Sequence, residues 1–190
     1  MIEPIKIEEI NTIVNMHYDA FKGLLTSDLG KDYITYLFTN IINSEYGICY
    51  GYKIDSKIVG FVCGTSDFKK IWDIKFKVKL AKFAITAVIN NPSIIHKIVK
   101  YLWVHYQVGK IGINAHILSI VVLNNYRKKG IGLELVKNFS TFIRNKNLKS
   151  YLVNTDANTQ ASKFYFKTGF KLVKTIKFFN KKDNWFRYDL

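Results

Sequence analysis

Three cations stand directly before two glycines in the chain: Arg127, Lys128 and Lys129 precede Gly130 and Gly132. Glycine admits backbone conformations and close approaches that a side chain forbids. Cationic side chains beside such a backbone indicate that the approaching group is an anion. The spacing matches neither the P-loop nor the dinucleotide-binding pattern. These residues therefore predict a phosphate site of another class, with an ordinary turn and helix start as the alternative.

The residues on either side of the glycines predict a strand, a turn and a helix. The apolar run from His116 to Leu123 is typical of a buried strand. From Gly130 to about Arg144, apolar residues recur at helical spacing. Unpaired backbone N–H groups and the positive end of the helix dipole meet at such a helix start. This combination binds phosphate groups, and the neighbouring lysines add charge.

A second block of residues follows one predicted strand later, between Asn158 and Phe170. Together with the run from Arg127 to Gly132, this block resembles the two motifs of the GCN5-related N-acetyltransferase (GNAT) family. The first motif is Q/R-x-x-G-x-G/A at the start of a long helix, and the second is N-x-x-A-x-x-F-Y-x-x-x-G-F. The positions that match the second motif are Asn158, Ala161, Phe164, Tyr165, Gly169 and Phe170.

The resemblance implies that acetyl-CoA is the acetyl donor and that no metal takes part. The strand backbone would bind the pantetheine arm, the backbone amides of the turn would hold the pyrophosphate, and an asparagine would contact the arm from the other side. Side chains at the two glycines would then occupy the space of phosphate oxygens. The implied cofactor-binding residues are Ile120, Val121, Val122, Arg127, Lys128, Lys129, Gly130, Ile131, Gly132, Leu133 and Asn158.

The resemblance also implies a catalytic residue, Tyr165, which would donate a proton to the departing thiolate. A positioned acid of this kind contributes roughly 10²–10⁴-fold to a rate. The alternative is that Tyr165 is a packed aromatic beside Phe164 and Phe166. A backbone N–H near Val122 is the implied donor to the carbonyl oxygen, on which negative charge develops.

The general base stays open. Some family members carry a glutamate on the strand before the second motif, but residues 150–154 contain no acid. Asp156, His17 and His116 are the candidates. Asp156 has the alternative role of capping the following helix, and His17 that of a buried core residue. Deprotonation of the amine through water, without a dedicated residue, is the remaining alternative.

A chain of 190 residues is expected to form a single domain, residues 1–190. Its periodicity predicts a mixed α/β fold, and the resemblance implies a central, mostly antiparallel, twisted sheet flanked by helices. A hairpin with its turn at Asp55–Lys57 places Cys49 opposite Cys63, and both are expected to be buried free thiols. The other expected elements are strands at 4–7, 150–154, 170–179 and 184–190, and helices from Glu8, from Ser27–Asp28 as cap, and over 158–167.

Residues 68–110 carry nine lysines and one acid. Apolar residues at helical spacing predict a helix that ends at Asn90-Asn91-Pro92, followed by a second helix from Ser93 to about Tyr106. Lysines fall on the opposite face of the first helix. The family commonly joins these strands by a shorter connection, so this segment is interpreted as a lysine-rich helical insertion. The apolar residues of the first helix are Trp72, Phe76, Leu80, Phe83 and Ala87.

The formal net charge of +15 favours anionic partners. The implied activity is transfer of an acetyl group to a primary amine of a small molecule, and charge favours an anionic acceptor such as an amino sugar. Alternatives are a module that binds nucleic acid or anionic membranes, with residues 68–110 as the contact, and a CoA-binding protein without turnover. A homodimer is a further candidate. The N-terminus resembles no signal peptide, and no apolar run reaches the length of a membrane span, so a cytoplasmic location is expected.

Overall fold

The computed structural model describes residues 1–179 and 181–190. Its centre is a seven-stranded sheet with the order β1-β2-β3-β4-β5-β7-β6. Neighbouring strands are antiparallel except β4 and β5, which are parallel, so the prediction of a mixed α/β fold with a mostly antiparallel sheet is confirmed. The strands are β1 Ile2–Pro4, β2 Gly47–Ile54, β3 Lys57–Thr65, β4 His116–Val122, β5 Ser150–Asp156, β6 Lys171–Phe178 and β7 Lys181–Asp189.

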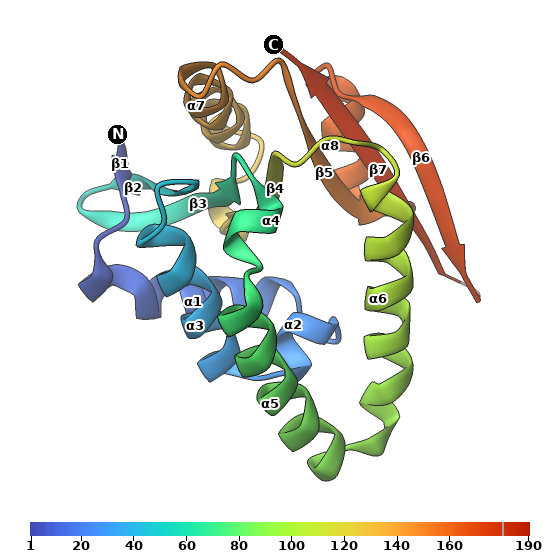
Figure 1. Cartoon of the computed structure of the whole chain (residues 1–190). Coiled ribbons are helices and arrows are strands. Elements are labelled where there is room, and N and C mark those ends of the chain that lie inside the picture. The colour runs from blue at the N-terminus through green and yellow to red at the C-terminus, as the bar shows by residue number, and fades with distance from the viewer. Residues whose placement is uncertain (180) are drawn as a thin grey trace.

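Helices cover both faces of the sheet (Figure 1). One face packs against α1 and α3 and the other against α7, while α8 lies on β5 and β6. The α-helices are α1 Ile10–Ala20, α2 Leu25–Asp28, α3 Lys31–Ile42, α4 Phe68–Ile71, α5 Ile74–Asn90, α6 Ile95–Gly109, α7 Ile131–Asn145 and α8 Gln160–Lys167. Short 3-10 helices lie at Ile7–Glu9, Pro92–Ile94 and Asn124–Tyr126.

Each face of the sheet has its own hydrophobic core because successive side chains of a strand point to opposite faces. On the α1 and α3 side, Ile13, Ile34, Phe38 and Phe61 are fully buried. On the α7 side the fully buried residues are Leu135, Phe139, Ile143, Tyr151 and Phe186. The sheet is thereby held at a fixed distance from the helices on both sides.

The hairpin of β2 and β3 turns at Asp55 and Ser56, which both have positive φ angles (48° and 62°). Cys49 pairs directly with Cys63, as predicted, because a register shift between Tyr52 and Lys53 adds one residue to the offset that this two-residue turn sets. The expectation of two free thiols is wrong, since the structure joins these cysteines in a disulfide. The physical reason is their direct cross-strand pairing, which brings their Cα atoms within 4.2 Å of each other.

Two N-terminal boundaries differ from those predicted. The first strand lies at Ile2–Pro4, earlier than residues 4–7. Ser27 and Asp28 do not cap a long helix but belong to the short α2, and α3 begins after Gly30, whose φ is 91°. A glycine at this φ lets the chain turn into the helix without a side-chain cap. The sequence patterns that identify capping residues therefore do not locate this helix start.

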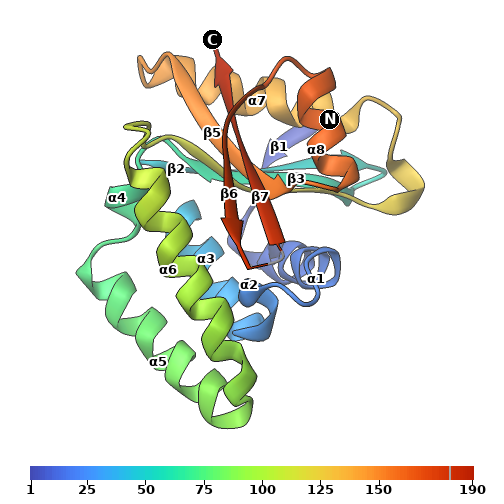
Figure 2. The same ribbon diagram turned by 90° about the vertical axis from the view of Figure 1, so that its right-hand side faces the viewer.

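The helical prediction for residues 68–110 is confirmed. Asp73 accepts a hydrogen bond from the Phe76 amide (2.8 Å) at the start of α5, and the helix ends at Asn90 before Pro92. Phe76 and Ala87 are buried against the rest of the molecule. The helices α5 and α6 form a V that projects from the α1–α3 side of the sheet (Figures 1 and 2).

Candidate functional site

The site is built around a gap between β4 and β5. These two parallel strands pair only at His116 and Leu152, whereas β5 pairs along its length with β7 on its other side. In β4, Ile117 pairs with Gly64 and Ser119 with Cys63, so Leu118 is an extra, bulged residue. A bulge increases strand twist and turns the strand away from its neighbour. The β5-facing edge of β4 beyond His116 therefore has backbone groups without a sheet partner among the described residues.

The turn after β4 is held in shape by three contacts. The Leu123 amide donates to the carbonyl of Val59 (2.9 Å), and the Arg127 amide donates to Asn124 (3.2 Å). The Arg127 side chain folds back, and its Nε donates to the carbonyl of Val122 (3.0 Å). Two residues then adopt left-handed backbone angles, Lys128 with φ 62° and Gly130 with φ 82°. The chain consequently curls into the first turn of α7.

This curl leaves five consecutive backbone N–H groups, those of residues 128–132, with no acceptor among the hydrogen bonds of the described chain. The next two amides, of Leu133 and Glu134, donate to the carbonyl of Gly130 (3.0 and 3.1 Å). Lys128 and Lys129 are exposed beside the curl, and the Lys129 ammonium lies 5.4 Å from the Tyr126 ring centroid. Free amides, a helix N-terminus and two cations are features that suit an anion with more than one phosphate, and we call this turn the cradle.

The two glycines of the curl have different structural roles. Gly130 has open space where a Cβ would stand, but its φ of 82° strains any residue with a side chain. Gly132 has no such strain, and a Cβ there would lie 3.3 Å from ring atoms of Phe164. Gly132 thus brings the first turn of α7 against α8, which joins the two sequence motifs in space. Whether these glycines also leave room for phosphate oxygens stays a prediction.

The second motif forms the turn before α8 and α8 itself. The Asn158 amide donates to Asp156 Oδ1 (3.2 Å), while the Asn158 side chain is exposed. Thr159 caps α8 by accepting from the Ser162 amide (3.3 Å). Asp156 therefore holds the turn instead of capping the helix.

Tyr165 lies in the core between α8 and the sheet and is 3% exposed. Its ring contacts those of Phe164, Phe170 and Phe186, with centroids 5.5, 5.1 and 5.6 Å away. Burial raises the pKa of the Tyr165 phenol, so the hydroxyl keeps its proton at neutral pH. A protonated phenol fits the role of general acid, and the ring contacts equally fit the packing role.

His17 connects three elements on the α1 side of the sheet. Its Nδ1 lies 2.9 Å from Ser119 Oγ on β4, and its Nε2 lies 3.2 Å from Thr26 Oγ1 on α2. Burial lowers the pKa of His17 to about 4, so the imidazole is neutral at pH 7. Both ring nitrogens have hydroxyl partners, which leaves neither free to contact an amine directly.

His116 is a less suitable base. Its Nε2 donates to the carbonyl of Ile113 (2.9 Å), and its ring packs against those of Phe68 and Trp185. Burial lowers its pKa to about 4. It lies at the closed end of the gap, where β4 and β5 still pair.

Sequence reasoning did not single out Ser119 or Thr26 as site residues. Ser119 is the one hydroxyl in the apolar run from His116 to Leu123 and is buried in the structure. A lone polar residue in a buried strand needs a hydrogen-bond partner. That need could have indicated a contact, although the partner could not have been named.

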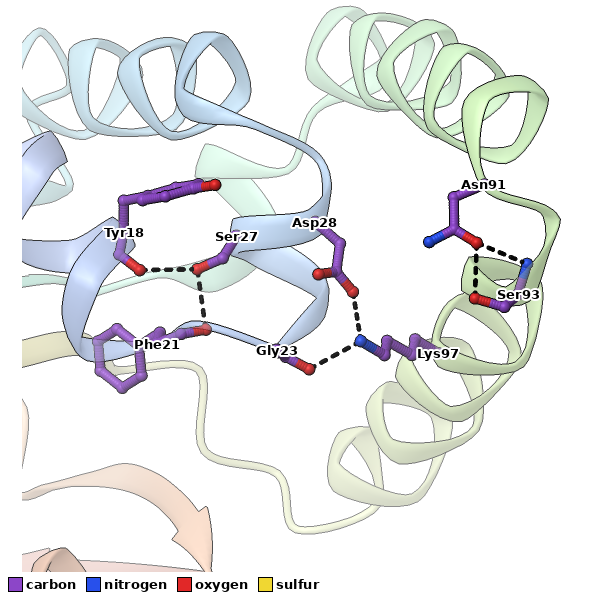
Figure 3. A network of polar contacts seen from close by, with 8 residues as sticks. All are labelled: Tyr18, Phe21, Gly23, Ser27, Asp28, Asn91, Ser93 and Lys97. Carbon is purple, nitrogen blue, oxygen red and sulfur yellow. Dashed lines mark hydrogen bonds and ion pairs between the residues drawn. The ribbon is translucent and has the colours of Figure 1, made fainter.

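The loop between α1 and α2, next to Thr26, is fixed to α6 (Figure 3). The Lys97 ammonium donates to the carbonyl of Gly23 (2.8 Å) and forms an ion pair with Asp28. Ser27 Oγ donates to the carbonyl of Phe21 (2.8 Å) in the same loop. The position of Thr26, which contacts His17, therefore depends on the position of α6.

A sequence model of the acetyltransferase (GNAT) family matches residues 13–170. Among curated proteins, none matches the chain. Solved structures share its fold at low identity. An N-acetyltransferase from Staphylococcus aureus Mu50 is 18% identical over 100% of this chain and 97% of its own, with a TM-score of 0.64. The protein smu.2055 from Streptococcus mutans UA159 is 21% identical over 100% of this chain and 98% of its own, with a TM-score of 0.61.

A third solved structure contains a ligand. It is the PaiA N-acetyltransferase from Thermoplasma acidophilum in complex with coenzyme A. It is 13% identical over 99% of this chain and 98% of its own, with a TM-score of 0.61. At these identities the solved structures show a shared fold and no more.

Proposed function

The chain belongs to the acetyltransferase (GNAT) family, and from this membership we propose that it is an N-acetyltransferase that uses acetyl-CoA. The acetyl group is transferred to a primary amine of a small acceptor. One observation carries the proposal: the five free amides of residues 128–132 lie at the start of α7, directly after the unpaired edge of β4. Phosphates and an extended amide-bearing arm are the two ligand parts that such a surface accepts.

Each part of the cradle has a binding role in this proposal. The amides of residues 128–132 hold the pyrophosphate, and Lys128 and Lys129 add positive charge beside it. The free edge of β4 from Ile120 to Val122 binds the pantetheine arm through backbone hydrogen bonds, as it would bind an additional strand. The exposed Asn158 side chain forms the opposite wall. Acetyl-CoA supplies the acetyl group, activated as a thioester.

Proton transfer accompanies the reaction. Transfer forms the amide C–N bond and breaks the thioester C–S bond, so the amine nitrogen loses a proton and the sulfur gains one. Tyr165 donates the proton to the sulfur, because burial keeps the phenol protonated at neutral pH. The backbone N–H groups near Val122 stabilise the negative charge that develops on the carbonyl oxygen.

We assign no side chain as general base. His17 binds a proton weakly, with a pKa of about 4, and both its nitrogens are occupied. His17 is therefore a positioning residue, which holds the Ser119 hydroxyl and α2. The proton of the amine leaves through water at the open end of the β4–β5 gap.

The acceptor follows from charge. The net charge of +15 repels cationic amines at a distance and attracts acceptors that carry phosphate or carboxylate groups. An amine on an anionic small molecule, such as a nucleotide-linked amino sugar, is the acceptor class that we propose. Thiol release measured over matched amines tests it: the kcat/KM of anionic amines should exceed that of neutral and cationic ones. A preference for cationic amines would contradict the acceptor class and leave acetyl transfer standing.

Cofactor binding is tested by thermal unfolding with and without acetyl-CoA. A ligand at about 100 times its Kd stabilises a protein by roughly 2.7 kcal/mol. The parent chain should show this shift, and a Lys128→Glu/Lys129→Glu variant should lose most of it, because two anions then flank the pyrophosphate. Gly132→Glu should lose it as well, while Gly109→Glu serves as a matched control at a site with no atoms within 4 Å. A parent protein that is folded and shows no shift would refute the proposed cofactor, and retained binding without thiol release would indicate a CoA-binding protein without turnover.

A further inference from the structure

Helix α5 has a second apolar face that no element of the described residues covers. Phe76, Leu80, Phe83 and Ala87 pack inward against the core beside α3. Ile74, Val78, Ile85 and Ile89 recur at spacings of 4, 7 and 4 and are 71, 54, 61 and 75% exposed. At 100° per residue these four side chains lie opposite the buried face. A helix on the surface of a globular protein normally has one apolar stripe and a polar opposite face.

Helix α6 repeats the arrangement. Val104 and Val108 pack against β5 and the β6–β7 pair, where they meet Leu152, Ile176 and Trp185. The opposite side presents Ile95, Val99, Leu102, Trp103 and Tyr106, all exposed. Both helices cover the same side of the molecule, next to α2 and α3 (Figure 2). We call the exposed apolar residues of α5 and α6 together the outer stripe.

The charge around the outer stripe has one sign. Residues 74–110 contain seven lysines and no acidic residue. Lys97 and Lys100 form ion pairs with Asp28 and Asp183, which fix α6 to α2 and β7. Lys75, Lys77, Lys79 and Lys82 are exposed on α5, on both flanks of the stripe. Among the described residues, none of these four lysines forms an ion pair.

A groove lies on one flank of the stripe. It has a volume of about 370 Å³ and is lined by Tyr36, Ile74, Lys75, Val78, Lys79 and Lys82. Three ammonium groups and two exposed aliphatic side chains meet at one place. An amphiphile with a phosphate head and an apolar tail has the chemistry that matches these lining groups.

We propose that α5 and α6 seat the protein on the surface of a bilayer that contains anionic phospholipids. The outer stripe enters the boundary between headgroups and acyl chains, and the lysines of α5 bind the headgroup phosphates. Trp103 and Tyr106 suit this boundary, because such rings combine an apolar body with a polar tip. No helix of the described residues is long and apolar enough to cross a membrane, so the two helices lie along its surface.

A second copy of the chain is a weaker occupant for this face. Symmetric pairing of two outer stripes would bring the four free lysines of each α5 towards those of the other. Like charges across an interface oppose association. Anionic lipid instead offers apolar and negatively charged groups at the same surface, which complements both features of the stripe.

Vesicle sedimentation tests the proposal with the full chain. Phosphatidylcholine vesicles with phosphatidylglycerol should bind the protein at low salt, and vesicles of phosphatidylcholine alone should bind far less. Changing Lys75, Lys77, Lys79 and Lys82 to Gln should weaken binding by at least about a hundredfold. The matched control changes Lys57, Lys146, Lys149 and Lys163 to Gln, which removes the same charge from exposed sites elsewhere and should keep most of the binding.

A second pair of variants tests the apolar contact. Val78→Glu/Ile85→Glu should reduce vesicle binding by about tenfold or more. Ile7→Glu/Leu148→Glu changes two exposed apolar residues outside the stripe and should bind as the parent does. All variants should retain the parent's circular dichroism and its stabilisation by acetyl-CoA, which separates this proposal from the proposed function. Equal binding to both vesicle types would overturn the proposal, and so would no binding to either. A third contradicting result is a parent protein that binds no vesicles and forms a dimer that Val78→Glu/Ile85→Glu dissociates.

Discussion

His17 Nδ1 lies 2.9 Å from Ser119 Oγ, although 102 residues separate them in sequence. The contact joins α1 to the strand whose free edge is proposed to bind the pantetheine arm. Because His17 also reaches Thr26, one buried imidazole links the first two helices to β4. A change in this contact should affect both the stability of the protein and the geometry of the acceptor side of the site.

Ser119→Ala removes the hydroxyl and leaves one nitrogen of His17 without a partner. An unsatisfied buried polar group costs about 1–3 kcal/mol, so the free energy of unfolding in urea should fall by that amount. The kcat should fall with little change in the KM for acetyl-CoA. Ser140→Ala is the control, since it removes a buried hydroxyl contact to Tyr151 (2.9 Å) on the α7 side. It should lower stability comparably and leave kcat near the parent value. Equal losses of kcat in Ser119→Ala and Ser140→Ala would contradict a positioning role for Ser119.

Stability should fall steeply on acidification because of His17 and His116, which are buried, and His105, which is partly buried. Burial lowers the pKa of His17, His105 and His116 from 6.5 to about 4. Between these values the unfolded chain binds protons that the folded chain excludes, so the free energy of unfolding decreases as the pH falls from about 6.5 to about 4. The contribution of each histidine is at most roughly 3 kcal/mol. Urea unfolding at a series of pH values measures this slope.

The matched variant for the pH effect is His17→Gln, which removes one of the three groups. Between pH 6.5 and 4, the free energy of unfolding of this variant should change less steeply with pH than that of the parent, by the equivalent of about one proton. A parent stability that stays constant over this range would contradict neutral burial of these imidazoles.

Gly130 should tolerate asparagine better than valine. Its φ of 82° is left-handed, where a residue with a side chain costs roughly 1–2 kcal/mol and asparagine is among the best tolerated. Gly130→Val should therefore lower stability and weaken acetyl-CoA binding, whereas Gly130→Asn should keep most of both. Calorimetric titration with acetyl-CoA measures the affinity. Identical affinities for the two variants would show that the backbone angle at Gly130 does not shape the cradle.

Tyr165→Phe separates the two roles of this side chain. The substitution keeps the ring contacts with Phe164, Phe170 and Phe186 and removes the proton. As a general acid, Tyr165 contributes about 10²–10⁴-fold, so kcat should fall by that factor at an unchanged melting temperature. Because burial raises its pKa, activity of the parent should show no alkaline decline from Tyr165 near neutral pH. Unchanged kcat in Tyr165→Phe together with unfolding of Tyr165→Ala would identify a packing residue only.

The ion pair of Lys97 and Asp28 should contribute measurably to the docking of α6. Its side chains are 27 and 22% exposed, compared with 68 and 69% for Lys22 and Asp19. A double-mutant cycle with Lys97→Gln and Asp28→Asn should give a coupling of about 1 kcal/mol. The same cycle at Lys22 and Asp19 should give less than about 0.5 kcal/mol. Equal couplings would mean that burial does not strengthen the inner pair.

The parts of the fold that depend on neighbouring residues were predictable from sequence. The cations and glycines before α7, the hairpin turn at Asp55 and Ser56, and the helical spacing of Phe76, Leu80 and Phe83 are all local patterns. The family resemblance joined the first of these patterns, together with the block from Asn158 to Phe170, to acetyl-CoA. The pairing of Cys49 with Cys63 was predicted from a turn centred on Ser56, but in the structure it also depends on the register shift between Tyr52 and Lys53, which counting residues does not reveal.

Contacts between distant segments could be decided only by the tertiary structure. Strands β4 and β5 are neighbours but pair only at His116 and Leu152, which opens the gap, and no local pattern states where two strands stop pairing. The contact of Gly132 with Phe164, the His17–Ser119 link and the disulfide are of the same kind. Sequence alone determined the glycine-bearing turn before a helix and predicted that this turn binds an anion, because backbone conformation is set by adjacent residues. The structure decided what surrounds that turn, because packing and strand register depend on the whole chain.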